Sequence, residues 1–428
     1  MTRSRRTRRR PVLRTLLAAC LLAATAGACA DGREETLVVL GPWTGAEGEA
    51  FETMLHRLDD GTGKTYTYQG TRSLRETLVA QLEAGDPPDV AVLNSVGELT
   101  EYARAGRLRP LDTASAARAY PPWAPSLVVD GLRRTYWVPL KVDLKSLVWS
   151  KEGQPAADPE WCVGLASQAT SGWPGTDWIE DILLHRSGPD VYTEWATGRL
   201  GWQDEKGPVR EAWRTWARLL GARGKDSVDR SLTTGYLGTP HGAERGLLRS
   251  LKGCTHEHQS AFIRYVYADA RVRVDPSAGF LGGRAAYDDA YEVSGDMAAV
   301  FSDDPAARTL VRRLSGTRAR ELWRDEAEPA LRPFFPDAAD PQPRDPTGRR
   351  IARILTEQAR TLCFDASDVM PPVLRDAFHR AVLEYFRNPT DDRLDTLLAQ
   401  LDTVRLQAAK DAGPGRPPRS GVCAPPGG

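Results

Sequence analysis

The sequence predicts an α/β protein in which short strands alternate with helices around a parallel sheet. Short apolar runs end at Gly, Pro or polar residues, and the segments between them carry Leu and Phe at helical spacing. The connections are short, as in βαβ units, whose strands are parallel. The chain has 428 residues, and single hydrophobic cores stop growing at about 250–300 residues, so we expect two domains.

Residues 37–105 contain three strand–helix pairs. The first apolar run ends at Gly41-Pro42, and Phe51, Leu55 and Leu58 then share one helical face. In a parallel sheet the carboxyl ends of the strands meet at one edge, where ligands bind. We therefore expect Trp43, residues 69–72 and Asn94 at that edge. The predicted strands are 37–40, 66–68 and 88–93, and the predicted helices are 47–58, 74–82 and 96–105.

The rest of the chain is mainly helical. Two extended stretches flank the polar segment Lys141-Val142-Asp143, and the tail from Gly413 is rich in Pro and Gly. The predicted strands are 136–139, 147–149 and 293–301, and the predicted helices are 176–184, 209–220, 242–251, 305–314, 349–361, 372–386 and 390–404.

The N-terminus predicts export. Six Arg precede an apolar stretch from Leu13 to Ala26, a seventh (Arg14) lies near its start, and small residues then lead to Cys29. Residues 1–28 are expected to be a signal peptide, with Cys29 resembling the lipid-bearing cysteine of a bacterial lipobox and residues 29–35 forming a tether. Two acyl chains would anchor the protein stably to the outer face of the cytoplasmic membrane. A plain secretory signal with an incidental Cys29 is the alternative.

Charge and motifs exclude several classes of function. Without residues 1–28 the chain has 50 basic and 57 acidic residues, a balance that argues against a nucleic-acid partner. No G-x-S-x-G motif is present, and the sequence 61–65 lacks the first Gly of a phosphate loop. His256 and His258 lack a third ligand nearby. We therefore expect no catalytic residues, no metal and no cofactor.

Four cysteines follow Cys29. An even number in an oxidising compartment favours two disulfides, although four cysteines allow three pairings, and zinc binding is the alternative. Cys162 and Cys254 both flank motif-like segments, so we expect that pair and the pair Cys363–Cys423.

Tryptophan is abundant, with twelve in the chain. The segment 171–178 (SGWPGTDW) combines two indoles, a flexible turn and Asp177. An indole face can stack on a sugar ring while a carboxylate accepts its hydroxyls, which is typical of small-molecule sites. Packing at the start of a helix is the alternative for Trp173 and Trp178. Four further tryptophans lie at helical spacings or helix ends and are expected in the core: Trp195, Trp202, Trp213 and Trp216.

These features together resemble the extracellular solute-binding lipoproteins of ABC importers, in the maltose-binding-protein-like group (family 1) and its α-glucoside-type sugar-binding subgroup. The resemblance spans most of residues 36–405. The segments that carry it are 85–90 (GDPPDV), 137–149 (WVPLKVDLKSLVW), 171–181 (SGWPGTDWIED), 253–254 with 259–262, 294–301 (SGDMAAVF) and 364–371 (FDASDVMP).

The resemblance implies a two-lobed type II periplasmic-binding-protein-like fold. Each lobe would be a mainly parallel sheet flanked by helices, and hinge crossings would join the lobes. The expected divisions are lobe 1 at 36–138 plus about 292–332, lobe 2 at 139–291 plus about 333–410, and a tail at 411–428.

The implied function is capture of a sugar or oligosaccharide, without catalysis, by a monomer that delivers it to ABC permease subunits. A receptor for another polar solute, such as an amino-sugar derivative, a polyol or a peptide, is one alternative. A secreted carbohydrate-active hydrolase is the other. The residues expected to contact the ligand are Trp43, Asn94, Trp173, Asp177, Trp178, Gln259, Asp296 and Asp368.

Overall fold

A computed structural model describes residues 36–58, 63–155, 159–204, 206–238, 244–268, 270–282, 285–411 and 421–426. The expected signal peptide, Cys29 and tether lie outside these residues, as does most of the expected tail. Within the described ranges, no helix combines the length and the apolar character needed to span a bilayer.

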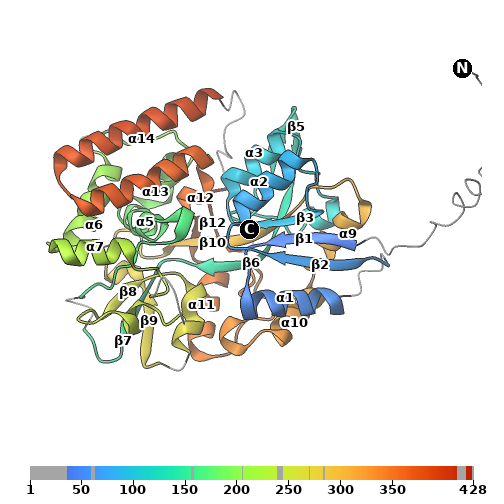
Figure 1. Cartoon of the computed structure of the whole chain (residues 1–428), viewed down its shortest axis with the longest axis horizontal. Coiled ribbons are helices and arrows are strands. Elements are labelled where there is room, and N and C mark those ends of the chain that lie inside the picture. Colours follow the sequence, from blue (N-terminus) through green and yellow to red (C-terminus); the bar gives the residue numbers. More distant parts are fainter. Residues whose placement is uncertain are drawn as a thin grey trace, which may run out of the picture.

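A seven-stranded mixed sheet forms the centre of the molecule (Figure 1). Its order is β12-β11-β10-β3-β1-β2, and β6 also pairs with β10. β1 is parallel to β2 and β3, whereas β10 is antiparallel to β3 and β6 and parallel to β11. The strands are β1 (Thr36–Gly41), β2 (Thr65–Gly70), β3 (Val90–Leu93), β6 (Trp137–Leu144), β10 (Ala290–Val300), β11 (Thr361–Phe364) and β12 (Cys423–Ala424).

The three strand–helix pairs expected at residues 37–105 are confirmed, with two largely buried strands, β1 and β3, and a mostly exposed edge strand, β2. Ser95 accepts a hydrogen bond from the backbone N–H of Glu98 and so caps the third helix. Phe51 of α1 packs against Trp323 of α10 at 5.0 Å between ring centroids. The helices of this region are α1 (Gly45–Arg57), α2 (Leu74–Ala84), α3 (Val96–Arg104), α4 (Thr113–Ala116), α9 (Pro305–Leu314) and α10 (Thr317–Glu326).

The second sheet corrects the expectation of a mainly parallel sheet in each lobe. Its three strands, in the order β8-β7-β9, are antiparallel: β7 (Leu147–Lys151), β8 (His256–His258) and β9 (Val272–Pro276). Helices separate β7 from β8 in the sequence, which is typical of a parallel crossover. Here those helices pack on one another instead, and the apolar pattern of a strand does not specify its direction. A two-stranded hairpin is formed separately by β4 (Leu127–Val129) and β5 (Leu132–Arg134).

Helices dominate the part of the molecule built on this second sheet. Trp195, Trp202 and Trp213 are fully buried around Phe378, which confirms their expected core positions, and Trp216 is buried nearby. The remaining helices are α5 (Trp173–Ala196), α6 (Pro208–Leu220), α7 (Lys225–Thr233), α8 (Leu247–Ser250), α11 (Pro346–Thr356), α12 (Ala366–Val369), α13 (Pro372–Arg387) and α14 (Asp391–Asp411).

Among the described residues two disulfides form, and they are the expected pairs, Cys162–Cys254 and Cys363–Cys423. Cys423 lies in β12, which pairs with β11 at the edge of the central sheet. The last described residues, 421–426, are therefore fastened to the sheet by both backbone hydrogen bonds and a covalent bond.

The elements fall into two halves, which lie side by side in Figure 1. The first half contains β1–β5, α1–α4, α9 and α10, and the second contains β7–β9, α5–α8, α13 and α14. β6 and β10 pair along their length between the two halves, and the chain enters β7 directly after β6. The exact lobe boundaries remain a prediction.

Candidate functional site

Polar side chains cover one face of the paired strands β6 and β10. Lys141 lies opposite Asp296 in the register, and Asp143 lies opposite Ser294. Because side chains alternate along a strand, these four share a face. Lys141 Nζ lies 2.5 Å from Glu47 Oε1 and 3.5 Å from Asp296 Oδ2. The face thus presents an ion-paired cation between two carboxylates.

Trp43 joins this face through its indole N–H. Nε1 donates a hydrogen bond to Asp296 Oδ2 at 2.9 Å, and Lys141 Nζ lies 5.6 Å from the ring centroid. The side chain is only 3% exposed and packs against Phe51 and Trp323. Trp43 therefore orients Asp296 and offers little free ring face for stacking.

Asp143 is a charged group of this face whose carboxylate has no side-chain partner among the described residues. Among the described residues, no side-chain hydrogen bond or ion pair reaches its half-buried carboxylate. Burial raises the pKa of Asp143 to about 7, although Lys141 opposes the rise. A carboxyl group without a hydrogen-bond partner at this position can accept a hydrogen bond from a ligand hydroxyl.

A buried charge cluster surrounds Lys145, directly after β6. Its Nζ lies 2.8 Å from Asp177 Oδ1 and 3.4 Å from Glu292 Oε1, and it also bonds Asp365. Burial alone would lower the pKa of Lys145, but these carboxylates hold it above its usual value. Asp177, Glu292 and Asp365 are close enough together to hold a metal ion, but the ammonium group of Lys145 already bonds Asp177 and Asp365 and forms an ion pair with Glu292.

Three aromatic side chains, Trp173, Tyr236 and Phe262, lie beside this cluster and are called the aromatic wall below. Trp173, the first residue of α5, is half-buried and meets Tyr236 at 4.9 Å and Phe262 at 6.2 Å between ring centroids. Lys145 Nζ lies 5.9 Å from its ring centroid. Gly172 turns the chain into α5 with φ at 109°, and a Cβ there would collide with the carbonyl oxygen of His379. The Gly172 turn thus fixes the indole in place.

Asn94 and Asp368 form a third polar contact. Asn94 follows β3 and is exposed, and its Nδ2 donates to Asp368 Oδ2 at 3.1 Å. Asp368 lies in α12, where Arg375 Nη1 is 3.4 Å from its other oxygen. Burial raises the pKa of Asp368 to about 7, and Asp365 contributes to the rise.

Two expected site residues lie elsewhere. Trp178 is 3% exposed and packs against Trp161 at 4.5 Å and against His258 at 4.6 Å between ring centroids, within the second half. Gln259 is 3% exposed; its side chain accepts from the backbone N–H of Ser260. Both side chains complete the packing of the second half and are not brought to the other candidates.

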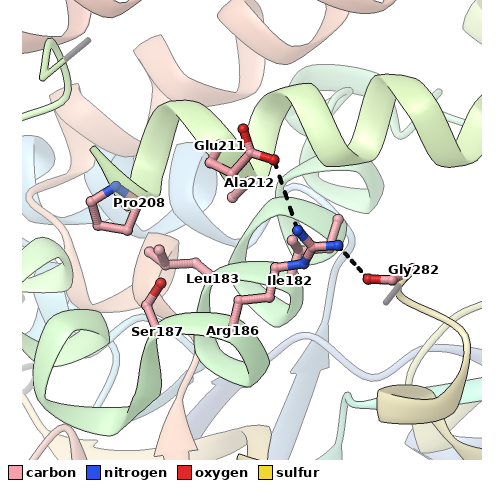
Figure 2. A pocket seen from close by; sticks show the side chains of 8 residues that line it. All are labelled: Ile182, Leu183, Arg186, Ser187, Pro208, Glu211, Ala212 and Gly282. Atoms are coloured by element: carbon pink, nitrogen blue, oxygen red, sulfur yellow. Dashed lines mark hydrogen bonds and ion pairs between the residues drawn. The ribbon is translucent and has the colours of Figure 1, made fainter. Parts of the chain in front are cut away.

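The pocket drawn in Figure 2 is also separate from these residues. It lies on the second half between α5 and α6, has a volume of about 350 Å³, and is partly filled by Arg186. The Arg186 guanidinium lies 3.8 Å from Glu211 and also bonds the Gly282 carbonyl. None of the candidate site residues lines this pocket.

Sequence reasoning missed Asp143 and Lys145 as functional candidates. A signal was present, because Lys141, Asp143 and Lys145 alternate with apolar residues, which is typical of a strand with one polar face. Tyr236 and Phe262 carried no such signal, since only the tertiary fold brings them to Trp173.

The buried carboxyls make stability depend on pH. Burial raises the pKa values of Asp143, Asp177 and Asp368 from 3.8 to about 7, so the folded state binds protons more tightly than the unfolded state. Their ionisation lowers stability as the pH rises from about 4 to about 7. Burial would also raise the pKa of Asp365, but Lys145 holds it at about 2, so its contribution is lost only in stronger acid.

We therefore expect a higher melting temperature at pH 5 than at pH 8, measured by thermal unfolding in buffers of equal ionic strength. Asp143→Asn should reduce this difference, because the variant lacks one of the three groups. A melting temperature that stays constant or falls between pH 8 and pH 5 would contradict the assignment.

Comparisons with known proteins connect the chain to receptors for small solutes. Residues 59–229 match the family described as bacterial extracellular solute-binding protein. The chain is 27% identical over 382 residues to the alpha-glucosides-binding periplasmic protein AglE of Rhizobium meliloti (strain 1021), covering 80% of this chain and 81% of that protein. It is 28% identical over 378 residues to the osmoprotective compounds-binding protein GgtB of Synechocystis sp. (strain ATCC 27184 / PCC 6803 / Kazusa), covering 81% and 87%.

Solved structures of solute-binding proteins have a fold similar to that of this chain. The bacterial solute receptor AcbH, described as preferring β-D-galactopyranose, superposes with a TM-score of 0.64 at 12% identity, covering 88% of this chain and 99% of that one. A chitin oligosaccharide binding protein gives a TM-score of 0.63 at 14% identity, with the same coverage. At such identities the likeness concerns the arrangement of the chain alone.

Proposed function

We propose that this chain, which has the two-lobed type II fold of solute-binding proteins, is a bacterial extracellular solute-binding protein that captures an α-glucoside-like sugar or oligosaccharide and delivers it to an ABC importer. Capture takes place where the two halves meet, and hinge bending at β6 and β10 closes them over the ligand. The protein is a receptor and catalyses no reaction, in keeping with relatives that are named as binding proteins.

The observation that carries this proposal is the half-buried aromatic wall of Trp173, Tyr236 and Phe262 beside a set of fixed carboxylates. Aromatic faces suit the C–H faces of sugar rings, and carboxylates accept hydroxyl hydrogens in fixed directions. Among the described residues no side chain donates a hydrogen bond to the Asp143 carboxylate, which can therefore accept one from a ligand. Asp177 bonds Lys145, whose ammonium group lies over the Trp173 ring. We propose Trp173 and Asp143 as the ligand-binding centre, with Asp177, which is 3% exposed, positioning Lys145 beside the Trp173 ring.

The other candidates support this centre. Asp296 is oriented by Trp43, and Asn94 is held by Asp368 through its amide nitrogen. We propose that Asn94 from the first half and Asp296 from β10, between the halves, bind ligand hydroxyls, while Trp43 and Asp368 position them. Each half thus contributes polar groups, so a bound sugar stabilises the closed arrangement by its differential affinity for it.

A receptor for a different polyhydroxylated solute, such as a polyol, is the second candidate. It is favoured by the relative named for osmoprotective compounds, which is as similar to this chain as the α-glucoside relative is. The same carboxylates would bind either ligand, and the aromatic wall distinguishes them, because only a ring presents a flat C–H face for stacking.

We also propose that the chain works outside the cytoplasmic membrane as a monomer, anchored through acyl chains on Cys29 after removal of residues 1–28. The basic head, the apolar stretch and the small residues before Cys29 support this. Transport energy would come from a separate ATPase, since the glycine pattern of a phosphate loop is missing from the sequence.

A thermal-shift screen of residues 30–428 tests the proposed function. The ligands are α-glucosides, other mono- and oligosaccharides and polyols, with amino acids and peptides as controls. A ligand present at 100 times its dissociation constant adds about 2.7 kcal/mol to the free energy of unfolding, which raises the melting temperature by several degrees. A shift with α-glucosides, and no product released, supports the sugar receptor. A shift with polyols alone supports the second candidate, and a shift only with amino acids or peptides overturns both.

A further inference from the structure

Two arginines of the first half form ion pairs with carboxylates of the second half. Arg72, in the turn after β2, has its Nη2 2.8 Å from Glu244 Oε1, and Glu244 precedes α8. Arg75, in the first turn of α2, has its Nη1 2.8 Å from Asp376 Oδ2 in α13. The two arginines thus lie close together in the sequence, and each contacts a different element of the second half.

Each side of these pairs is held within its own half. Arg72 Nε donates to Thr44 Oγ1 at 3.3 Å, and Arg75 Nε lies 2.9 Å from Glu98 Oε1 of α3. In the second half, the Tyr265 hydroxyl donates to the other oxygen of Glu244. The bond to Glu244 raises the pKa of Arg72 above its usual value. The charges are therefore preorganised, which reduces the entropy lost when the halves meet.

From this geometry we propose that Arg72–Glu244 and Arg75–Asp376 act as an arginine clasp that holds the two halves in the closed form. The clasp residues are positioning residues, because they join the halves and do not contact the ligand. The inference rests on the proposed function only in taking the halves to open and close about the hinge. An interaction made only in the closed form shifts the equilibrium towards that form, with or without a ligand.

The expected strength of the two ion pairs follows from the solvent exposure of their side chains. The Arg72 and Glu244 side chains are 54% and 30% exposed, and those of Arg75 and Asp376 are 38% and 37% exposed. Ion pairs of this kind are weak and are screened by salt. We expect removal of one pair to change the ratio of open to closed protein by about two- to fivefold, and removal of both by about tenfold.

The experiment measures the open and closed populations of the ligand-free protein by single-molecule energy transfer. Dyes are attached through Leu132→Cys in β5 and Leu406→Cys in α14, two exposed positions on different halves. The test variants are Arg72→Ala, Arg75→Ala and their combination. The charge-reversed pair Arg72→Glu with Glu244→Arg tests whether the contact itself matters. Arg214→Ala is the matched control, because its partner Asp391 belongs to the same half.

The expected result is a shift towards the open population in the clasp variants, partial recovery in the charge-reversed pair, and no shift in Arg214→Ala. Raising NaCl from 20 to 500 mM should open the unmodified protein and have little further effect on the double variant. Equal populations in the unmodified protein and the double variant at low salt would overturn the clasp. Because no sugar is used, this outcome is independent of whether the protein binds one.

Discussion

Replacing Lys145 by methionine is expected to lower the free energy of unfolding by about 3–5 kcal/mol at pH 7. Its ammonium group lies among Asp177, Glu292 and Asp365, all of them buried, and removing it leaves these carboxylates without their cation. Buried negative charges that lose their counterion repel one another and cannot be hydrated. Urea unfolding, followed by circular dichroism, measures the loss.

The pH dependence of this loss separates the charge from the packing. The destabilisation should shrink between pH 7 and pH 5, because protonation neutralises the carboxyls that Lys145 no longer balances. If Lys145→Met does not fold, adding Asp365→Asn should restore part of the stability by removing one of the unbalanced charges. Lys225→Met is the control, since its pair with Asp229 is exposed and should change stability by about 0.5 kcal/mol or less. A loss independent of pH would contradict the electrostatic role.

Replacing Trp173 by alanine is expected to weaken sugar binding by about thirtyfold or more, which corresponds to about 2 kcal/mol. The indole is half-buried at the start of α5, and it packs against Tyr236 and Phe262. A large aromatic group fixed in this way loses little freedom when a ligand stacks on it. Titration calorimetry with the sugar found in the thermal-shift screen measures the change.

Two control variants distinguish a ligand contact from a structural role. Trp173→Phe keeps an aromatic face at the same place and should weaken binding much less than Trp173→Ala. Trp178→Phe alters a buried indole that packs against Trp161, so it should lower the melting temperature while leaving the affinity nearly unchanged. An affinity of Trp173→Ala equal to that of the unmodified protein would remove Trp173 from the proposed site.

Much of the first half could be predicted from the sequence. Strands and helices between residues 36 and 104 follow from apolar periodicity, which depends on residues only a few positions apart. The pairing of the four described cysteines was also expected correctly, because few pairings were available.

The candidate site was predicted less completely. Trp43 and Trp178 were chosen because they lie beside flexible or polar residues, yet both are buried by contacts with residues distant in sequence, such as Trp323 and Trp161. Asn94 and Asp368 were chosen separately, and the structure brings them together across 274 positions. A single sequence indicates which side chains suit a ligand but not which remain accessible after packing.

The sequence by itself determined the order of local elements in the first half, since that order depends on short-range spacing. Only the tertiary structure decided the antiparallel second sheet, the environment of Lys145 and the ion pairs of Arg72 and Arg75. Lys145 meets Asp365 across 220 positions of the chain. Electrostatic energies depend on distance and burial in space, and neither quantity is specified by the spacing of residues along the chain.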